Sequence, residues 1–141
     1  MATSTKTIRD VMTSNPTTIQ PSTSIVDAAR KMRDEDVGSL PIVEGGQLTG
    51  TITDRDITIR AIAEGRDAQS TTVGEIASRD LVTIDPQQSL EEAARLMGQH
   101  QLRRLPVVEE DGRLVGILAQ ADIAQSGHDE LTGEVVEKIS Q

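Results

Sequence analysis

A hydroxyl and a carboxylate placed just after an apolar segment carry the clearest chemistry in this sequence. Thr53 and Asp56 follow the stretch that begins at Leu48, and Gly50 stands three positions before the threonine. A carboxylate can accept two hydrogen bonds from the vicinal hydroxyls of a ribose, and the threonine hydroxyl can reach ribose or phosphate. The free amides at a helix start also favour an anion or a polar ligand. The same Thr-x-x-Asp pattern is an ordinary helix N-cap, so both interpretations stay open.

The pattern returns later in the chain with one change. Asp122 corresponds to Asp56, but Ala119 stands where the first pattern has Thr53. The alanine removes a hydroxyl and an N-cap, which costs about 1 kcal/mol of helix stability. Ligand binding at Asp122 is therefore in question.

These two patterns belong to an internal repeat. Residues 8–57 reappear in order at residues 73–123, and 17 of the 50 aligned pairs are identical. The offset is 65 residues up to Glu109 and 66 from Gly112 onward, because Asp111 is an extra residue. Two copies of one unit predict a body with pseudo-twofold symmetry and paired, unequal sites.

Each copy predicts the order strand, helix, strand, strand, helix. The first copy has a helical turn at 8–13, a β-branched strand at 17–19, a helix from the Ser24 capping box to Asp36, a hairpin of 40–43 and 48–53, and a helix from Asp54 to about Glu64 that ends at Gly65. The second copy has a helix that begins at the Ser89 capping box, strands at 105–108 and 114–118, and a helix from about Gln120.

This order predicts an α/β fold. A strand-helix-strand crossover followed by a hairpin gives a small mixed sheet with helices on one face. We expect one repeat at 8–64 and another at 72–126, joined by a polar linker at 66–72. Residues 127–141 are expected to form an acidic tail, in which 133–139 could form a short helix. Since half of the chain alone would be marginally stable, we expect the two halves to share a core.

The amino-acid composition limits the cellular compartment and the kinds of binding partner that we expect for this protein. The chain has no Phe, Tyr, Trp or Cys, so its core must be aliphatic and a bound base would lie between aliphatic side chains and peptide planes. A net charge of −9 argues against a nucleic-acid partner. No apolar run approaches the ~20 residues that cross a membrane, and residues 1–10 lack the apolar region of a signal peptide. The absence of cysteine fits a reducing compartment, so we expect a cytoplasmic protein without a membrane partner.

The doubled pattern resembles the CBS (cystathionine β-synthase) motif, and two motifs in tandem resemble a CBS pair, or Bateman module, over residues 8–124. Three stretches carry the resemblance: Gly-Ser-Leu-Pro-Ile-Val at 38–43, Gly-Thr-Ile-Thr-Asp-Arg-Asp-Ile at 50–57, and His-Gln-Leu-Arg-Arg-Leu-Pro-Val-Val at 100–108. With nothing fused to the pair, the chain is similar to the small stand-alone members. The resemblance implies a regulatory, non-catalytic module that binds AMP, ADP, ATP or S-adenosylmethionine in the cleft between the repeats. It also implies a disc-like homodimer.

The resemblance further implies roles for particular residues. Asp56 becomes the ribose ligand of the first site, with Thr53 beside it, and Asp122 its weaker counterpart. Basic residues at the place of Arg103 and Arg104 often reach phosphate at the other copy's site in this family, and Arg55 could assist. The alternative is that these arginines are solvated or pair with nearby acids (Glu109, Glu110 and Asp111). The slot for adenine is implied at four residues that are equally candidates for the core: Thr18, Ile19, Ile42 and Val43.

We therefore expect a sensor of an adenosine-containing metabolite that signals through a conformational change or through an unidentified protein partner. The alternative is a protein-interaction or structural module with a vestigial ligand site. Residues 45–51 have the glycine spacing of a P-loop but lack its lysine, and His100 and His128 are lone histidines. No constellation supports acid-base or nucleophilic catalysis, so neither an enzyme, a metal site nor a required cofactor is expected.

Overall fold

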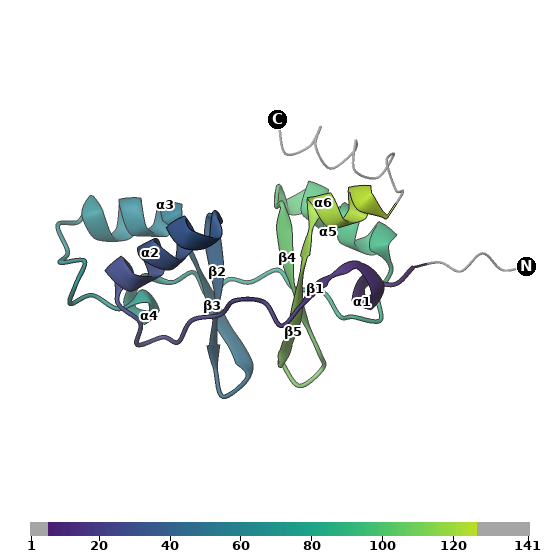
Figure 1. Ribbon diagram of the computed structural model, residues 1–141, viewed down its shortest axis with the longest axis horizontal. Helices are drawn as coiled ribbons and strands as arrows, with labels where there is room; N and C mark the ends of the chain where they lie inside the picture. The colour runs from purple at the N-terminus through teal and green to yellow at the C-terminus, as the bar shows by residue number, and fades with distance from the viewer. Residues whose placement is uncertain (1–5, 127–141) are drawn as a thin grey trace, which may run out of the picture. The chain divides into compact units, whose positions relative to one another are not determined.

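The computed structural model describes residues 6–126, which form two compact units. One unit is Thr17–Leu81, and the other combines the segment up to Pro16 with the chain from Val82 onward. Each unit has helices on one side of a small sheet (Figure 1). The acidic tail expected at 127–141, with its short helix, lies outside the described residues. Within residues 6–126 no helix is long and apolar enough to span a membrane.

The unit Thr17–Leu81 is built around the predicted hairpin of β2 (Ser39–Glu44) and β3 (Gln47–Thr53). The expected strand at 17–19 is reduced to one residue, Ile19, which forms a parallel bridge with Ile42. The Ile19 N–H donates to the Pro41 carbonyl at 3.1 Å, and the Ile19 carbonyl accepts from the N–H of Val43 at 2.8 Å. The predicted crossover between parallel strands is therefore present.

The crossover helix α2 (Ile25–Glu35) begins and ends where the sequence predicts. The Ser24 hydroxyl accepts the Asp27 N–H at 3.2 Å, which satisfies one of the free amides at the helix start. The Asp27 carboxylate lies 3.7 Å from the Arg30 guanidinium. Asp36 ends the helix in the left-handed conformation, with φ of 56°.

The segment after β3 differs from the expected regular helix at 54–64. It begins as α3 (Asp54–Asp56) and continues as a π-helix, η1 (Ile57–Ile62). The wider turn is visible where the Ala63 N–H donates to the Thr58 carbonyl, five residues back, at 2.9 Å. Gly65 follows with a positive φ of 74°, as the sequence predicts for a helix stop. Such π-helical turns are rare and often occur at functional sites.

The short helix α4 (Val73–Ile76) completes this unit, although the sequence assigns it to the second repeat. After α4 the chain pairs with β3, because Ser78 and Thr51 exchange both backbone hydrogen bonds at 3.0 Å. Part of the second sequence repeat thus forms an edge of the first repeat's hairpin.

The other unit holds an antiparallel sheet in the order β1–β5–β4. Its elements are α1 (Ile8–Val11), β1 (Thr13–Ser14), α5 (Leu90–His100), β4 (Arg104–Val108), β5 (Leu114–Ala119) and α6 (Gln120–Gln125). Ile84 adds a parallel bridge to Val107, as Ile19 does in the first unit. The helical turn expected at 8–13 is shorter than predicted, since it ends at Val11 and Thr13 pairs with Ile117 in the sheet.

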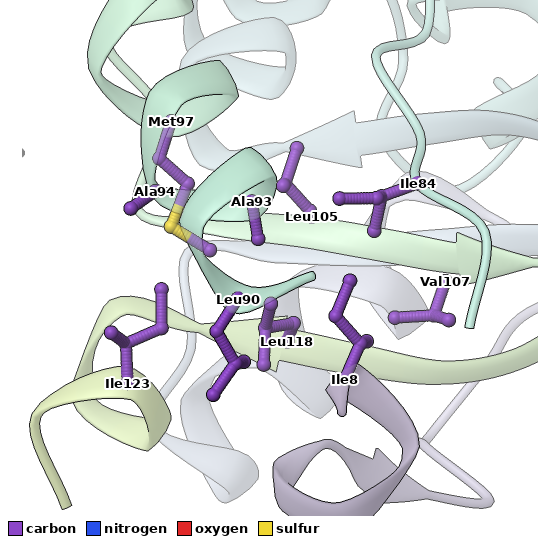
Figure 2. Packing of buried hydrophobic residues seen from close by; sticks show 10 residues of the cluster. All are labelled: Ile8, Ile84, Leu90, Ala93, Ala94, Met97, Leu105, Val107, Leu118 and Ile123. Atoms are coloured by element: carbon purple, nitrogen blue, oxygen red, sulfur yellow. The ribbon is translucent and has the colours of Figure 1, made fainter. Parts of the chain in front are cut away.

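Each unit has its own aliphatic core, and each core uses residues from both sequence repeats. Figure 2 shows one core, where Ile8 of α1 packs with residues of the second repeat: Ile84, Leu90, Ala93, Ala94, Met97, Leu105, Val107, Leu118 and Ile123. In the other core Val73 and Ile76 pack with first-repeat residues such as Ile25 and Ile52. The two halves therefore share core residues, as chain length led us to expect, but they do so in two clusters to which each repeat contributes.

Candidate functional site

The Asp56 carboxylate lies at the junction of β3 and α3, and the residue is 8% exposed. Its Oδ2 accepts the Thr53 N–H at 3.0 Å, while the Thr53 Oγ1 accepts the Asp56 N–H at 3.0 Å. The interpretation of Thr53 and Asp56 as a helix N-cap is therefore confirmed, and the pair forms a reciprocal capping box. This cap fixes the position and orientation of the carboxylate.

Two groups that the sequence did not single out also contact this carboxylate. The Ser78 Oγ lies 3.3 Å from both Asp56 Oδ1 and Asp56 Oδ2. The Arg60 Nε lies 3.8 Å from Asp56 Oδ1, and Arg60 Nη1 donates to the Ile76 carbonyl at 3.3 Å. Asp56 therefore joins three segments: the β3–α3 junction, the π-helix, and the residues at the end of α4.

The cluster keeps the capacity to accept further hydrogen bonds. A carboxylate has about four lone-pair positions, of which the Thr53 N–H uses one and the Ser78 hydroxyl proton uses another. The remaining positions on the two oxygens match the need of a vicinal diol, which donates one hydrogen bond to each oxygen. The geometry of Asp56 is thus compatible with both capping and ligand binding.

The four residues expected around adenine are divided between core and surface. Ile19 is 6% exposed and Ile42 1% exposed, so both lie in the core, whereas Thr18 and Val43 are half-buried. Thr18 lines a surface pocket of about 360 Å³ whose other lining residues are Ile19, Gln20, Thr23, Asp27 and Lys31. Thr53 and Asp56 are not among the residues that line this pocket.

The three candidate arginines are exposed and form no ion pair with any residue in the range 6–126; they are Arg55, Arg103 and Arg104. The acid Glu109, an alternative partner for two of them, instead pairs with Arg9 at 3.2 Å and Arg113 at 3.3 Å. Arg55 shares a unit with Asp56, while Arg103 and Arg104 belong to the other unit. Their expected role in binding phosphate stays a prediction.

Asp122 has fewer contacts than Asp56. Its Oδ2 accepts the Ala119 N–H at 2.7 Å, but the alanine has no oxygen to receive the Asp122 N–H in return. In the repeat alignment Thr13 takes the place of Ser78 and Ser126 takes the place of Arg60. Among the described residues, neither of these side chains forms a hydrogen bond with the Asp122 carboxylate, and the Ser126 hydroxyl donates instead to the Ile123 carbonyl. The two carboxylates thus have unequal environments, as the repeat predicts.

A comparison with protein families identifies the repeat. The model described as CBS domain matches residues 8–61 and again residues 73–129. The chain belongs to the CBS domain family. It therefore carries two CBS domains in tandem, and the predicted α/β pair is confirmed.

Relatives of similar length support this assignment. CBS domain-containing protein YhcV of Bacillus subtilis is 48% identical over 117 residues, which cover 83% of this chain and 82% of YhcV. Hypoxic response protein 1 of Mycobacterium tuberculosis is 41% identical over 120 residues, which cover 84% of this chain and 83% of that protein. The crystal structure of hypoxic response protein I with two coordinated zinc ions matches with a TM-score of 0.77 and 40% identity, covering 86% of this chain and 98% of that one. Between residues 6 and 126, no three His, Cys, Asp or Glu side chains are grouped to bind a metal ion.

Two further CBS structures hold ligands that contain adenosine. The crystal structure of CBSX2 in complex with AMP matches with a TM-score of 0.75 and 28% identity, covering 88% of this chain and 97% of that one. The CBS domain pair of protein MJ0100, in complex with 5′-methylthioadenosine and S-adenosyl-L-methionine, matches with a TM-score of 0.75 and 28% identity. That match covers 89% of this chain and 98% of the MJ0100 pair.

Proposed function

We propose that this CBS pair is a non-catalytic regulatory module that binds AMP, ADP, ATP or S-adenosylmethionine. The observation that carries the proposal is the Asp56 carboxylate, which Thr53 holds at the β3–α3 junction with acceptor positions available for a ribose diol. The AMP complex of CBSX2 and the MJ0100 complex support the class of ligand.

The other candidate residues have complementary roles in this proposal. The exposed guanidinium groups of Arg55, Arg103 and Arg104 bind phosphate, while Asp122 contributes less than Asp56. Adenine packs against the half-buried side chains of Thr18 and Val43, behind which Ile19 and Ile42 belong to the core.

The regulatory output depends on a change of shape or of partner. A ligand shifts a conformational equilibrium only through its different affinities for the two states. We propose that ligand binding to this protein favours one state, which a protein partner recognises. The chain acts in this proposal as a homodimer, which light scattering of the full chain would test: the mass of a single 15.2 kDa chain would contradict it.

A specific observation favours a second function, that of a protein-interaction module with a vestigial site. Asp56 is only 8% exposed, and its carboxylate already contacts Thr53 and Ser78. The second copy has lost the equivalent threonine hydroxyl at Ala119. In this alternative both carboxylates serve only as helix caps, and no adenosine ligand binds.

The ultraviolet spectrum of freshly purified native protein tests the proposal simply. With no Phe, Tyr or Trp, the chain itself is nearly transparent where adenine absorbs. An adenine band indicates a co-purified ligand, which mass spectrometry of the acid extract names and separates from contaminating nucleic acid.

A thermal-shift panel of the four proposed ligands then decides between the two functions. A ligand present at 100 times its dissociation constant stabilises the folded protein by about 2.7 kcal/mol, so a binding ligand raises Tm. The absence of a shift with AMP, ADP, ATP and S-adenosylmethionine would contradict the proposal and favour the interaction module.

A further inference from the structure

Ser78 occupies a fixed position beside Asp56 although it lies 22 residues away in the sequence. Its backbone N–H and carbonyl both pair with Thr51 at 3.0 Å. The glycine at position 50 favours this close approach, because a Cβ atom there would lie only 3.2 Å from the Ser78 carbonyl oxygen. With the backbone fixed in this way, rotation of the hydroxyl group is the main freedom that remains to Ser78.

The hydroxyl lies where it contacts both oxygens of the carboxylate. The two distances from Ser78 Oγ to Asp56 are equal, at 3.3 Å, and both are longer than the usual ~2.7–2.8 Å of an O–H···O hydrogen bond. One hydroxyl proton is therefore shared between two acceptors and binds neither at the optimal distance. The two oxygens that share this proton are the ones that a vicinal diol must reach.

We infer that the Ser78 hydroxyl is an internal competitor that sets the affinity and selectivity of Asp56 for ribose hydroxyls. This inference rests on the proposed function. A ligand with a 2′,3′-diol displaces the Ser78 hydroxyl from the carboxylate and replaces one shared hydrogen bond by two direct ones. A ligand without these hydroxyls leaves the contact between Ser78 and Asp56 in place.

The second copy provides an internal comparison. Thr13 occupies the equivalent position in β1 and pairs with Ile117, but among the described residues its hydroxyl forms no hydrogen bond with Asp122. The competing hydroxyl is thus a feature of the Asp56 site and not of the repeat as such.

The test compares calorimetric titrations of wild-type protein and Ser78→Ala with adenosine and with 2′,3′-dideoxyadenosine. We expect Ser78→Ala to bind adenosine about threefold to tenfold more tightly, a change of ~0.7–1.4 kcal/mol, because the ligand no longer breaks a hydrogen bond. The affinity for 2′,3′-dideoxyadenosine is expected to stay unchanged. A purely structural effect of the substitution would move both affinities together.

Three variants serve as controls. Ser78→Thr keeps the hydroxyl and is expected to bind adenosine with an affinity close to the wild-type value. Thr13→Ala makes the matched change in the other unit and is expected to leave adenosine binding unchanged. If Ser78→Ala does not fold, Ser78→Cys replaces the hydroxyl by a weak thiol donor and is expected to tighten binding in the same direction.

The outcomes separate this inference from the proposed function. Tighter adenosine binding by Ser78→Ala, including binding seen only in that variant, supports the inference. If wild-type protein binds adenosine and Ser78→Ala binds it equally or less tightly, or if both ligands shift alike, the inference is wrong and the proposed function stands. If neither protein binds adenosine at all, the inference is wrong, and the thermal-shift panel of AMP, ADP, ATP and S-adenosylmethionine decides separately whether the proposed function stands.

Discussion

The carboxylates at the two helix starts have different numbers of contacts because single residues differ between the copies. Asp56 contacts Thr53, Ser78 and Arg60, whereas Asp122 receives the Ala119 N–H at 2.7 Å. The backbone of Ala119 nevertheless has φ of −105° and ψ of 155°, close to the −117° and 161° of Thr53. The second copy therefore keeps the geometry of an N-cap and lacks only its hydroxyl.

Restoring this hydroxyl should stabilise the protein. Ala119→Thr is expected to raise the free energy of unfolding by about 1 kcal/mol, because the new Oγ1 can accept the Asp122 N–H, as Thr53 Oγ1 accepts the Asp56 N–H. Urea denaturation measures this change. Thr53→Ala removes the corresponding hydroxyl from the first copy and is expected to lower the free energy of unfolding by about the same amount. An unchanged or lower stability of Ala119→Thr would show that the site is not preformed.

Only part of the Asp56 cluster was predictable at the level of single residues. Thr53 and Asp56 lie three positions apart, and this spacing brings them together within one helical turn. Ser78 reaches the carboxylate through pairing with Thr51, a tertiary contact that no local spacing encodes. The available signal was the repeat alignment, which places a hydroxyl residue, Thr13, at the equivalent position of the other copy. Arg60 left no such signal, because its counterpart is Ser126.

At the scale of the elements, one glycine in each copy allows an edge segment to pack against a hairpin. A Cβ atom at Gly116 of β5 would lie 2.9 Å from the Thr13 carbonyl oxygen and would also clash with the Met12 side chain. At Gly50 of β3 the nearest atom is the Ser78 carbonyl oxygen, at 3.2 Å. A contact below 3.0 Å with a backbone atom forces the backbone to move, so a side chain is tolerated less well at Gly116 than at Gly50.

We expect Gly116→Ala to lower the free energy of unfolding by about 1–3 kcal/mol, the usual cost of overpacking. Gly50→Ala should cost less, since a shift of a few tenths of an ångström relieves its contact. Urea denaturation of the two variants side by side measures both values. Equal stabilities of the two variants would contradict the view that β1 packs tightly on β5.

The helix caps predict a dependence of stability on acid pH. Two hydrogen bonds hold the pKa of Glu75 below its ordinary value of 4.5. The larger effect comes from the Thr72 N–H at 2.7 Å, and the smaller one from the Thr72 hydroxyl at 3.2 Å. The backbone N–H of Thr7 likewise lowers the pKa of Asp10. Since each pKa is lower in the folded state, the unfolded chain binds more protons, and the stabilisation is lost as pH falls through the folded-state pKa.

Glu75→Gln isolates this effect. The wild-type protein should have the higher Tm above pH 4.5, where the carboxylate is charged in both states, and the difference should shrink as pH falls further. Thermal unfolding of both proteins across the acid range measures it. A difference in Tm that is independent of pH would mean that the Thr72–Glu75 cap contributes no pH-dependent stability.

The elements that the sequence predicted well are those with local signals. The helices α2 and α5 follow their serine caps, and the Ser89 hydroxyl accepts the Glu92 N–H at 3.0 Å as Ser24 does for Asp27. Strand β1 was missed because two residues give no alternating pattern, and its existence depends on pairing with β5. The π-helix η1 was missed because no local sequence pattern distinguishes a π-helical turn from an α-helical one.

At the scale of the whole molecule, the sequence repeats and the compact units have different boundaries. The first repeat begins with α1, whose Ile8 packs in the core of the other unit, and the second repeat begins with α4, whose Val73 packs in the core of Thr17–Leu81. Neither repeat therefore contains a complete core. This exchange could not be read from the repeat alone, because the same apolar pattern fits either core.

The exchange also matters for function, because it brings Ser78 of one repeat to Asp56 of the other, and the Ile76 carbonyl to Arg60. A ligand at Asp56 therefore acts on a cluster to which both sequence repeats contribute. We propose that the Asp56 carboxylate of this cluster binds the ribose of an adenosine-containing ligand.

Calorimetric titration of wild-type protein, Asp56→Ala and Asp122→Ala with AMP, ADP, ATP and S-adenosylmethionine tests this claim most directly. We predict that Asp56→Ala, with its folded state checked by circular dichroism, abolishes the binding seen in the wild-type protein, while Asp122→Ala weakens it less. Asp56→Asn, which keeps an oxygen for the Thr53 N–H, should also bind more weakly. Unchanged affinity in folded Asp56→Ala would contradict the claim.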